Sequence, residues 1–345
     1  MTKFRVIDAD GHCVERDSQL AQYAQYMGRS MKELDPGCFS FWPSLDGWFR
    51  PAGDKLAAGE PDAWLSFLED TGMEMTFLYP TAGLAFGLIQ DRAWSISLAK
   101  AYNDWLYNRY TKRDARLRGI ALVPILDVPA AVAELRRAVK ELGMPGAVLP
   151  AATVMGKPYG HADFDPLYQE AERLDCTLAL HGAPSKGFGF DFFDTFIKTH
   201  TLEHPFAILI QFTSMIFDGV FERFPNLRVA FLETGVGWVP YMMDRMDEEF
   251  ERRGARWCPF LKRKPSECIR GGNIYFSCEV EERTLPYVVE LLGEDNIFFA
   301  SDYPHERDRH QFLSDIPEFV ERTDLSDKVK EKILLHNAQR FYRLG

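Results

Sequence analysis

The chain has 345 residues, of which 46% are hydrophobic and 26% are charged, a composition typical of a globular protein with a large core. It carries 40 Lys and Arg residues against 51 Asp and Glu residues, so its formal net charge is −11. This acidic balance argues against nucleic acid or an anionic membrane surface as a partner. No apolar run approaches the roughly 20 residues that a membrane-spanning helix needs.

The N-terminal residues and the cysteines bear on the cellular compartment. The sequence MTKFRVIDAD has one basic pair followed by a strand pattern and an acidic turn, which is not the pattern of a signal peptide. Six cysteines are scattered without CxxC or paired spacing, namely Cys13, Cys38, Cys176, Cys258, Cys268 and Cys278. We therefore expect reduced thiols and a cytoplasmic protein.

Short apolar runs rich in β-forming residues recur along the chain, each followed by a longer stretch with helical periodicity. In chain order these runs are Phe4–Ile7, Met75–Tyr79, Gly119–Pro124, Ala147–Leu149, Thr177–Leu180, Arg228–Leu232, Ile274–Ser277 and Ile297–Ala300. The intervening segments predicted as amphipathic helices include Ala130–Leu142, Pro166–Leu174, Ser214–Phe224 and Leu285–Leu292.

Alternating β and α units predict a parallel sheet, and eight such units favour a closed (β/α)8 barrel over an open doubly wound sheet. The glycine fingerprint GxGxxG is absent after the first run, which argues against a dinucleotide-binding fold. We therefore expect an α/β protein whose residues 1–345 form one distorted (β/α)8 barrel.

Two long segments interrupt the alternation of strands and helices. Residues 17–62 follow the first strand and are rich in Trp, Phe, Pro and Gly, and residues 185–201, with GFGFDFFDTF at their centre, follow the fifth strand. In a barrel both would lie over the C-terminal mouth, where βα loops build the active site. They would cover an apolar pocket for an aromatic, terpenoid or acyl substrate; alternatively, they form a dimer contact or simply cover the barrel.

Side chains that bind metals fall at the ends of four predicted strands. Asp10 and His12 follow the first strand, His181 ends the fifth, Glu233 ends the sixth and Asp302 ends the eighth. Strand ends of a closed barrel meet at one face, so these residues should converge. Imidazole and carboxylate together are ligands of Zn, Mn and Fe(II), with positions left open for water or substrate. A lone His at a strand end is more often structural, but the joint placement predicts a metal site.

Longer motifs carry a resemblance over nearly the whole chain. They are IDADGHC, FDPLYQEAERLDCTLALHGAP, GVFERFPNLRVAFLETGVGW, SDYPH and KILLHNAQRFYRL. With these motifs the chain resembles the amidohydrolase-related (family 2) branch of the amidohydrolase superfamily, which includes aminocarboxymuconate semialdehyde and resorcylate-type decarboxylases. The resemblance implies a distorted (β/α)8 barrel with one divalent ion. Its first ligand pair matches Asp10 and His12, and its strand-five and strand-eight ligands match His181 and Asp302.

The chain also departs from that family. The first ligand pair is usually HxH or ExH, and the end of strand six usually carries a catalytic His where this chain has Glu233. Glu15, His204, His305 and Glu306 add further candidate ligands. The alternatives are loop capping or a salt bridge for the two glutamates, and a backbone-bonded helix residue for His204. If several of these side chains face the mouth, the clustered carboxylates need more than one cation, and a second metal becomes plausible.

The leading hypothesis is metal-dependent hydrolysis or non-oxidative decarboxylation of a small organic acid, ester or amide. Asp302 would serve as ligand and proton acceptor, with Glu233 or His204 as the second acid or base. The first alternative is a dinuclear non-haem iron oxygenase acting on a bulky hydrophobic or CoA-linked substrate, with Glu233, Glu15 and His305 among its ligands. The second alternative is a metal-binding barrel without activity. We expect Zn, Mn or Fe, or two Fe in the oxygenase, and a small-molecule substrate bound by a homo-oligomer, a dimer.

Overall fold

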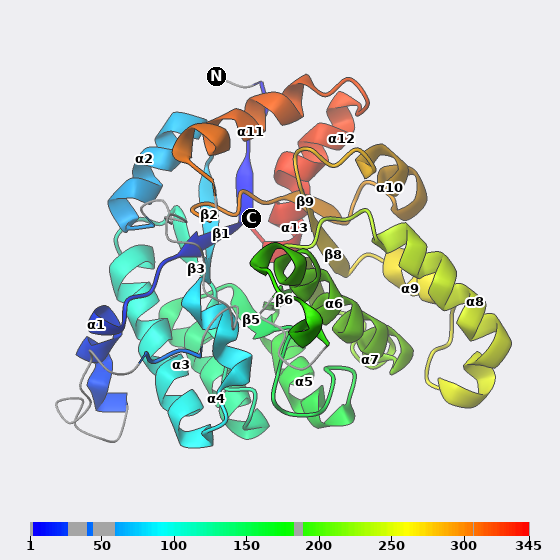
Figure 1. Ribbon diagram of the computed structural model, residues 1–345, viewed down its shortest axis with the longest axis horizontal. Helices are drawn as coiled ribbons and strands as arrows, with labels where there is room; N and C mark the ends of the chain where they lie inside the picture. The colour runs from blue at the N-terminus through cyan, green and yellow to red at the C-terminus, as the bar shows by residue number, and fades with distance from the viewer. Residues whose placement is uncertain (1–2, 27–39, 44–58, 183–188, 306, 345) are drawn as a thin grey trace.

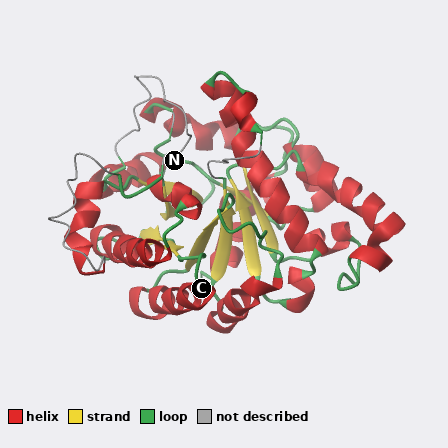
Figure 2. Ribbon diagram, turned by 60° about the horizontal axis from the view of Figure 1, so that its bottom comes forward, coloured by secondary structure: helices red, strands yellow, loops and turns green. Residues whose placement is uncertain are grey.

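The computed structural model describes residues 3–26, 40–43, 59–182, 189–305 and 307–344 (Figure 1). Its described strands lie in the interior with helices outside them, as Figure 2 shows. They form a three-stranded sheet of order β1-β2-β3 and a six-stranded sheet of order β4-β5-β6-β7-β8-β9. The strands are β1 (Ile7–Cys13), β2 (Met75–Pro80), β3 (Leu117–Gly119), β4 (Ala121–Leu122), β5 (Gly146–Pro150), β6 (Thr177–His181), β7 (Arg228–Leu232), β8 (Ile274–Cys278) and β9 (Ile297–Phe299).

Helices connect successive strands except β3 and β4, which only Ile120 separates. The α-helices are α1 (Asp17–Leu20), α2 (Pro61–Thr71), α3 (Arg92–Leu106), α4 (Val128–Leu142), α5 (Asp165–Leu174), α6 (Phe196–Phe217), α7 (Val220–Arg223), α8 (Val239–Trp257), α9 (Pro265–Arg270), α10 (Leu285–Leu292), α11 (Arg309–Glu321), α12 (Asp327–Glu331) and α13 (Asn337–Tyr342). Shorter 3₁₀ or π segments are η1 (Ala21–Tyr26), η3 (Ala82–Leu88), η4 (Tyr107–Thr111), η5 (Ala162–Phe164), η6 (Phe190–Phe192) and η7 (Lys332–His336). None of the described helices is long and apolar enough to cross a membrane.

Every pair of neighbouring strands is parallel. Local sequence explains why helices begin and end where they do. In α4, the Asp127 side chain accepts the backbone N–H of Ala130 at 3.0 Å, and the helix ends at Gly143, whose φ of 65° suits glycine. The structure thus shows a mixed α/β fold built on parallel sheets.

The ladders differ from the single eight-stranded sheet that the sequence predicts. The third predicted run divides into β3 and β4 on either side of Ile120, whose backbone N–H donates to Leu78 in β2 at 3.0 Å. After β9, Asp302 N donates to Asp10 O at 2.9 Å, and His12 N donates to Tyr303 O at 2.7 Å. The two sheets are therefore joined by backbone hydrogen bonds outside the ladders.

The first strand was predicted too early and too short. The run Phe4–Ile7 marks only its beginning, and β1 continues to Cys13, so Asp10 and His12 lie within the strand and not after it. All seven residues of β1 are buried. The apolar sequence pattern stops at Ile7 because the rest of β1 includes buried polar residues such as Asp8, Asp10 and His12.

The long helix α6 corrects two further expectations. The predicted helix Ser214–Phe224 is the end of α6 and the separate α7, divided at Gly219, whose φ is 70°. Because α6 begins at Phe196, the last six residues of the segment 185–201 are helical. Residues 183–188 lie outside the described residues.

Only part of the aromatic segment 17–62 falls within the described residues. Phe41 and Trp42 are buried, and their rings pack against Trp94 and Tyr102 of α3 with centroids 5.6 and 6.3 Å apart. Phe39, Trp48 and Phe49, on which the expectation of an apolar cover also rested, lie outside the described residues. The five cysteines within the described ranges are buried and form no disulfide.

One buried carboxylate ties β1 to both of its neighbours. Asp8 accepts the hydroxyl of Thr76 in β2 at 2.7 Å. It also accepts the backbone N–H and hydroxyl of Ser301, just after β9, at 2.9 and 2.8 Å. Gly11 makes room for this arrangement, because a Cβ there would lie 2.7 Å from the Asp8 carboxylate and 2.4 Å from Trp64. Asp8 therefore holds together the strands that carry Asp10, His12 and Asp302.

We predict that Asp8→Ala destabilises the protein by at least about 2 kcal/mol, because it leaves several buried donors without an acceptor. The urea midpoint followed by circular dichroism measures the effect. Asp8→Asn, which keeps one carbonyl acceptor, is the matched control and should lose less. An Asp8→Ala midpoint equal to that of the wild type would contradict the role given to this side chain.

Candidate metal centre

The residues expected to bind metal lie at the carboxyl ends of β1, β6, β7 and β9. Asp10 and His12 occupy the second half of β1, and His181 is the last residue of β6. Glu233 directly follows β7, and Asp302 follows β9. Asp10, His12 and His181 are buried, whereas the side chains of Glu233 and Asp302 are 17% and 28% exposed. The two partly exposed carboxylates mark the less buried side of the group.

Four of these side chains converge. His12 Nε2 lies 3.6 Å from Asp10 Oδ1 and 3.2 Å from Asp302 Oδ1. His181 Nε2 lies 3.4 Å from Asp10 Oδ2. One ligand atom each from Asp10, His12 and His181 falls within 4.8 Å of the others. Residues from three strands, far apart in sequence, thus face a common point.

Four buried atoms at this point have no hydrogen-bond partner among the described residues, namely Asp10 Oδ1, Asp302 Oδ1, His12 Nε2 and His181 Nε2. A buried polar atom without a partner costs about 1–3 kcal/mol, and native proteins rarely tolerate several together. A divalent cation would satisfy all four. Two imidazole nitrogens and two carboxylate oxygens form a donor set suited to Zn, Mn or Fe, so the residues present fit a metal ion.

The far nitrogens of the two histidines are held by backbone carbonyls. His12 Nδ1 lies 2.8 Å from Pro80 O, and His181 Nδ1 lies 2.8 Å from Gly182 O. Because a carbonyl only accepts, each Nδ1 carries the proton, and the lone pair on each Nε2 faces the common point. The two rings are therefore oriented as metal ligands usually are.

Burial sets the protonation of this group. It lowers the pKa of His181 to about 4 and also lowers the pKa of His12, so both imidazoles are neutral near pH 7, as ligation requires. Burial raises the pKa of Asp10 well above its usual value. The anion of Asp10 is therefore costly in this place unless a cation stands beside it.

Two residues of the site adopt a left-handed backbone conformation. Glu233 has a φ of 56° and Asp302 a φ of 55°. Such angles cost about 1–3 kcal/mol for residues other than glycine, and they persist where surrounding structure enforces them. Glu233 directly follows β7, and Asp302 lies three residues after the end of β9.

His305 supports Asp302. Its Nδ1 lies 2.8 Å from Asp302 Oδ1 and its Nε2 lies 2.9 Å from Thr81 Oγ1, so both ring nitrogens have neighbours. Its ring also stacks on that of His12, with centroids 4.0 Å apart. Although burial alone would raise the pKa of Asp302, the adjacent His305 imidazole lowers it well below its usual range. His305 also offers a ligand atom within 4.8 Å of atoms from His12 and Asp302, so it orients Asp302 and stays a candidate ligand.

Glu233 lies behind His181. Its Oε2 is 3.2 Å from His181 Nδ1, the nitrogen on the opposite side of the ring from the one that faces Asp10. Its Oε1 is 3.9 Å from Nδ1 of His204 on α6. Glu233 therefore links His181 of β6 to His204 of α6.

Glu15 is used differently from the expectation that it binds metal. Its carboxylate accepts the backbone N–H groups of Thr81, Ala82 and Gly83, at 3.0, 3.1 and 3.1 Å. These groups begin the segment η3, so Glu15 caps the loop after β2, which is the alternative that the sequence left open. Burial raises its pKa to about 7. Glu306 lies outside the described residues.

Sequence reasoning missed several contributors. Asp8, Thr76, Ser301 and Thr81 gave no signal beyond being polar residues near strand ends. His200 and Glu203 were missed as well, although the structure brings one atom from each of them within 4.8 Å of one from His204. The spacing of three and four residues in HTLEH was the signal, and it has meaning only on a helix.

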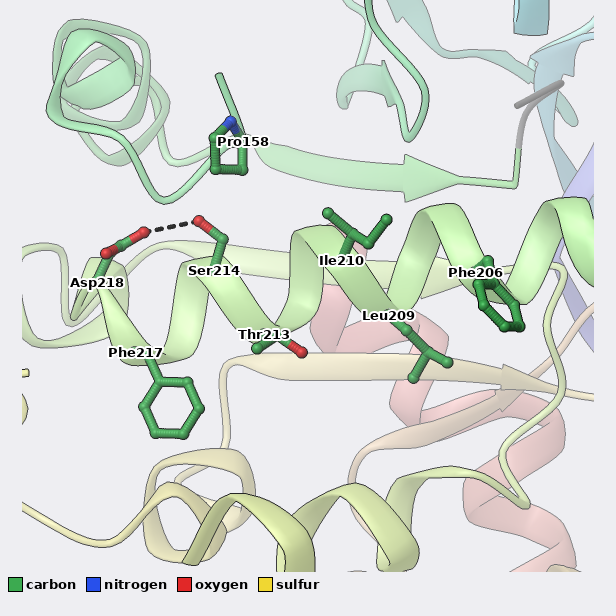
Figure 3. A pocket seen from close by; sticks show the side chains of 8 residues that line it. All are labelled: Pro158, Phe206, Leu209, Ile210, Thr213, Ser214, Phe217 and Asp218. Carbon is green, nitrogen blue, oxygen red and sulfur yellow. Dashed lines mark hydrogen bonds between the residues drawn. The ribbon is translucent and has the colours of Figure 1, made fainter. Parts of the chain in front are cut away.

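A separate hollow lies along the outer face of α6 (Figure 3). This groove has a volume of about 520 Å³, and its lining residues are Pro158, Phe206, Leu209, Ile210, Thr213, Ser214, Phe217 and Asp218. The Ser214 hydroxyl donates to Asp218 at 2.7 Å. None of the residues expected to carry chemistry lines it, so the groove is distinct from the metal centre.

Comparison with known proteins shows which family the chain matches. The family described as amidohydrolase matches residues 7–344. The 2-amino-3-carboxymuconate-6-semialdehyde decarboxylase of Dictyostelium discoideum is 26% identical over 342 residues, which cover 98% of this chain and 85% of that protein. A gamma-resorcylate decarboxylase of a Polaromonas species is 26% identical over 318 residues, which cover 88% of this chain and 91% of that protein.

Solved structures agree on the fold. A dihydroxybenzoic acid decarboxylase from Polaromonas, with bound manganese and the inhibitor 2-nitroresorcinol, superposes with a TM-score of 0.75 at 22% identity, covering 99% of this chain and 97% of that one. The 5-carboxyvanillate decarboxylase of Sphingomonas paucimobilis has a TM-score of 0.76 at 22% identity, covering 99% of this chain and all of that one. Similarity to characterised decarboxylases over most of its length identifies the chain as an enzyme. The match over residues 7–344 shows that it belongs to the amidohydrolase family.

Proposed function

We propose that this enzyme catalyses the metal-dependent, non-oxidative decarboxylation of a small aromatic carboxylic acid. The observation that carries the proposal is the convergence of four buried, unpartnered donor atoms at the ends of β1, β6 and β9. The relatives favour decarboxylation over hydrolysis, because their names describe carboxy-lyases. The oxygenase alternative finds no support among these relatives.

Asp10, His12, His181 and Asp302 are the proposed ligands of one divalent ion. Relatives with bound manganese make Mn a suitable first metal to test, and Zn and Fe(II) share the same donor preference. When bound, the ion would supply Lewis acidity toward an oxygen of the substrate. His305 would hold Asp302 in place through the 2.8 Å contact between its Nδ1 and Asp302 Oδ1. Thr81 would in turn hold His305, whose Nε2 lies 2.9 Å from its hydroxyl.

The reaction breaks the carbon–carbon bond between the ring and the carboxyl group and releases CO2. The ring carbon that loses the carboxyl group must then receive a proton. Asp302 is the proposed carrier of that proton, because its carboxylate lies at the partly exposed edge of the group. Glu233 and His204, 3.9 Å apart, are the proposed second acid and base, lying behind His181.

We also propose the finer description of the fold. The two parallel sheets would be two arcs of one distorted (β/α)8 barrel that forms a single domain. The bonds from Ile120 to Leu78 and from Asp302 to Asp10, which join the sheets at both edges, support this proposal. The homodimer and the cytoplasmic location stay predictions.

The proposed activity is tested with a panel of hydroxybenzoic acids that includes 2,6-dihydroxybenzoate and 5-carboxyvanillate. We expect CO2 and the decarboxylated arene in equal amounts from at least one acid. A chelator should abolish the release, and Mn²⁺ should restore it. Chelator-insensitive turnover, or hydrolysis of esters or amides without CO2 release, would contradict the proposal.

We predict that His181→Ala lowers the metal content of the purified protein without unfolding it, because the change removes the proposed ligand atom Nε2 and leaves the backbone pairing of β6 with β5 and β7 in place. Elemental mass spectrometry measures the content, and circular dichroism checks the fold. His161→Ala is the matched control, since that side chain is 46% exposed and its Nδ1 lies 3.4 Å from Asp163, which is not one of the proposed ligands. Equal metal content in both variants would exclude His181 as a ligand.

Glu233→Gln separates a proton-transfer role from ligation at this centre. Because Glu233 faces the far nitrogen of His181, the variant should keep at least one metal ion per chain while turnover falls by roughly 10²–10⁴-fold. Steady-state kinetics and metal analysis on the same preparation give both values. Loss of all metal, or unchanged turnover, would show that Glu233 has another role.

A further inference from the structure

The first turns of α6 carry a second group of side chains suited to metal binding. His200, Glu203 and His204 stand at positions i, i+3 and i+4, so they share one face of the helix. Their potential ligand atoms lie within 4.8 Å of one another. The His200 and His204 rings have centroids 5.0 Å apart at an angle of 61°. Two imidazoles and a carboxylate at this spacing form the three-residue donor set of many zinc sites, which keep a fourth position open.

The surroundings place this group inside the protein. Glu203 is 1% exposed, and the His204 side chain is 15% exposed. The same row of the helix continues to Phe212, whose ring packs against Phe231 of β7 with centroids 5.1 Å apart. The metal-binding face of α6 therefore lies on the side that covers the sheet, not on the side of the groove in Figure 3.

Gly182 allows the helix to approach the end of β6. A Cβ at this position would lie 2.9 Å from both Cβ and Cγ of His204, a distance that real Cβ contacts do not show. The residue that follows His181 must therefore lack a side chain for His204 to stand where it does. The close approach brings the α6 group next to the first metal centre.

Glu233 connects the two groups. Its two carboxylate oxygens lie 3.2 Å from His181 and 3.9 Å from His204. Two carboxylates, Glu203 and Glu233, thus flank the His204 imidazole. Carboxylate oxygens beside imidazole nitrogens form the mixed donor set that divalent transition metals accept.

We propose that His200, Glu203 and His204 form a second divalent-metal site, adjacent to the first and linked to it through Glu233. The ion would be a transition metal that accepts imidazole, such as Zn²⁺, Mn²⁺, Fe²⁺ or Co²⁺. The second site rests on and alters the proposed function, because His204 would then be a ligand and Glu233 alone would be the second acid or base. Its existence does not depend on the reaction being a decarboxylation.

The test counts Co²⁺ ions bound by the chelator-treated whole chain, using calorimetric titration and elemental analysis. The wild type is expected to bind two Co²⁺ per chain. Glu203→Gln, which preserves shape, and His200→Ala, at a part-exposed position, should each lose one Co²⁺ or bind it at least about tenfold more weakly. Thr201→Ala, on the exposed side of the same turn, is the matched control and should bind two.

The outcomes separate this proposal from the proposed function. If the wild type binds one Co²⁺, and Glu203→Gln and His200→Ala leave that binding unchanged, the α6 site is overturned and the first centre stands. If His181→Ala binds as many ions as the wild type while both α6 variants lose one, the first centre is overturned and the α6 site stands. Circular dichroism of each variant confirms that a lost ion does not reflect a lost fold.

Discussion

The structure of this site depends on one requirement: buried ligand atoms that face one another without hydrogen-bond partners need a cation between them. His12 and His181 commit their Nδ1 atoms to the carbonyls of Pro80 and Gly182, which fixes the two Nε2 lone pairs toward Asp10 and Asp302. Without a cation this arrangement leaves four polar atoms buried and unsatisfied. With one, the same atoms become a coordination shell, so folding of the strand ends and metal affinity are coupled.

The scaffold around the site serves this arrangement. Asp8 holds β1 against β2 and against the residues after β9, so the strands that carry Asp10 and Asp302 cannot separate without breaking buried hydrogen bonds. Glu15 fixes the loop after β2, and Thr81 at its start reaches His305. Each of these residues fixes the position of another residue of the site. Asp302 and Glu233 adopt left-handed backbone conformations in the turns that carry their carboxylates.

The sequence predicted most strand positions because buried parallel strands read as short apolar runs. It failed at β1, where Asp8, Asp10 and His12 are buried polar residues that break the apolar pattern. It also failed at the start of α6, where glycines and aromatic residues precede a helix that contains Pro205. Strand ends predicted which residues meet, since parallel strands share an edge. They did not predict in which direction each side chain points, and the Glu15 carboxylate accepts backbone N–H groups. The spacing in HTLEH was missed because we expected a loop after the fifth strand.

The metal site of this enzyme is proposed to be formed by Asp10, His12, His181 and Asp302 around one divalent ion. Anomalous diffraction from crystals grown with Mn²⁺ tests this proposal, because it locates the metal without reference to substrate or activity. We expect an anomalous peak at about 2.0–2.4 Å from Nε2 of both histidines and from carboxylate oxygens of the two aspartates. Crystals that contain manganese but show no peak among these four side chains would contradict it.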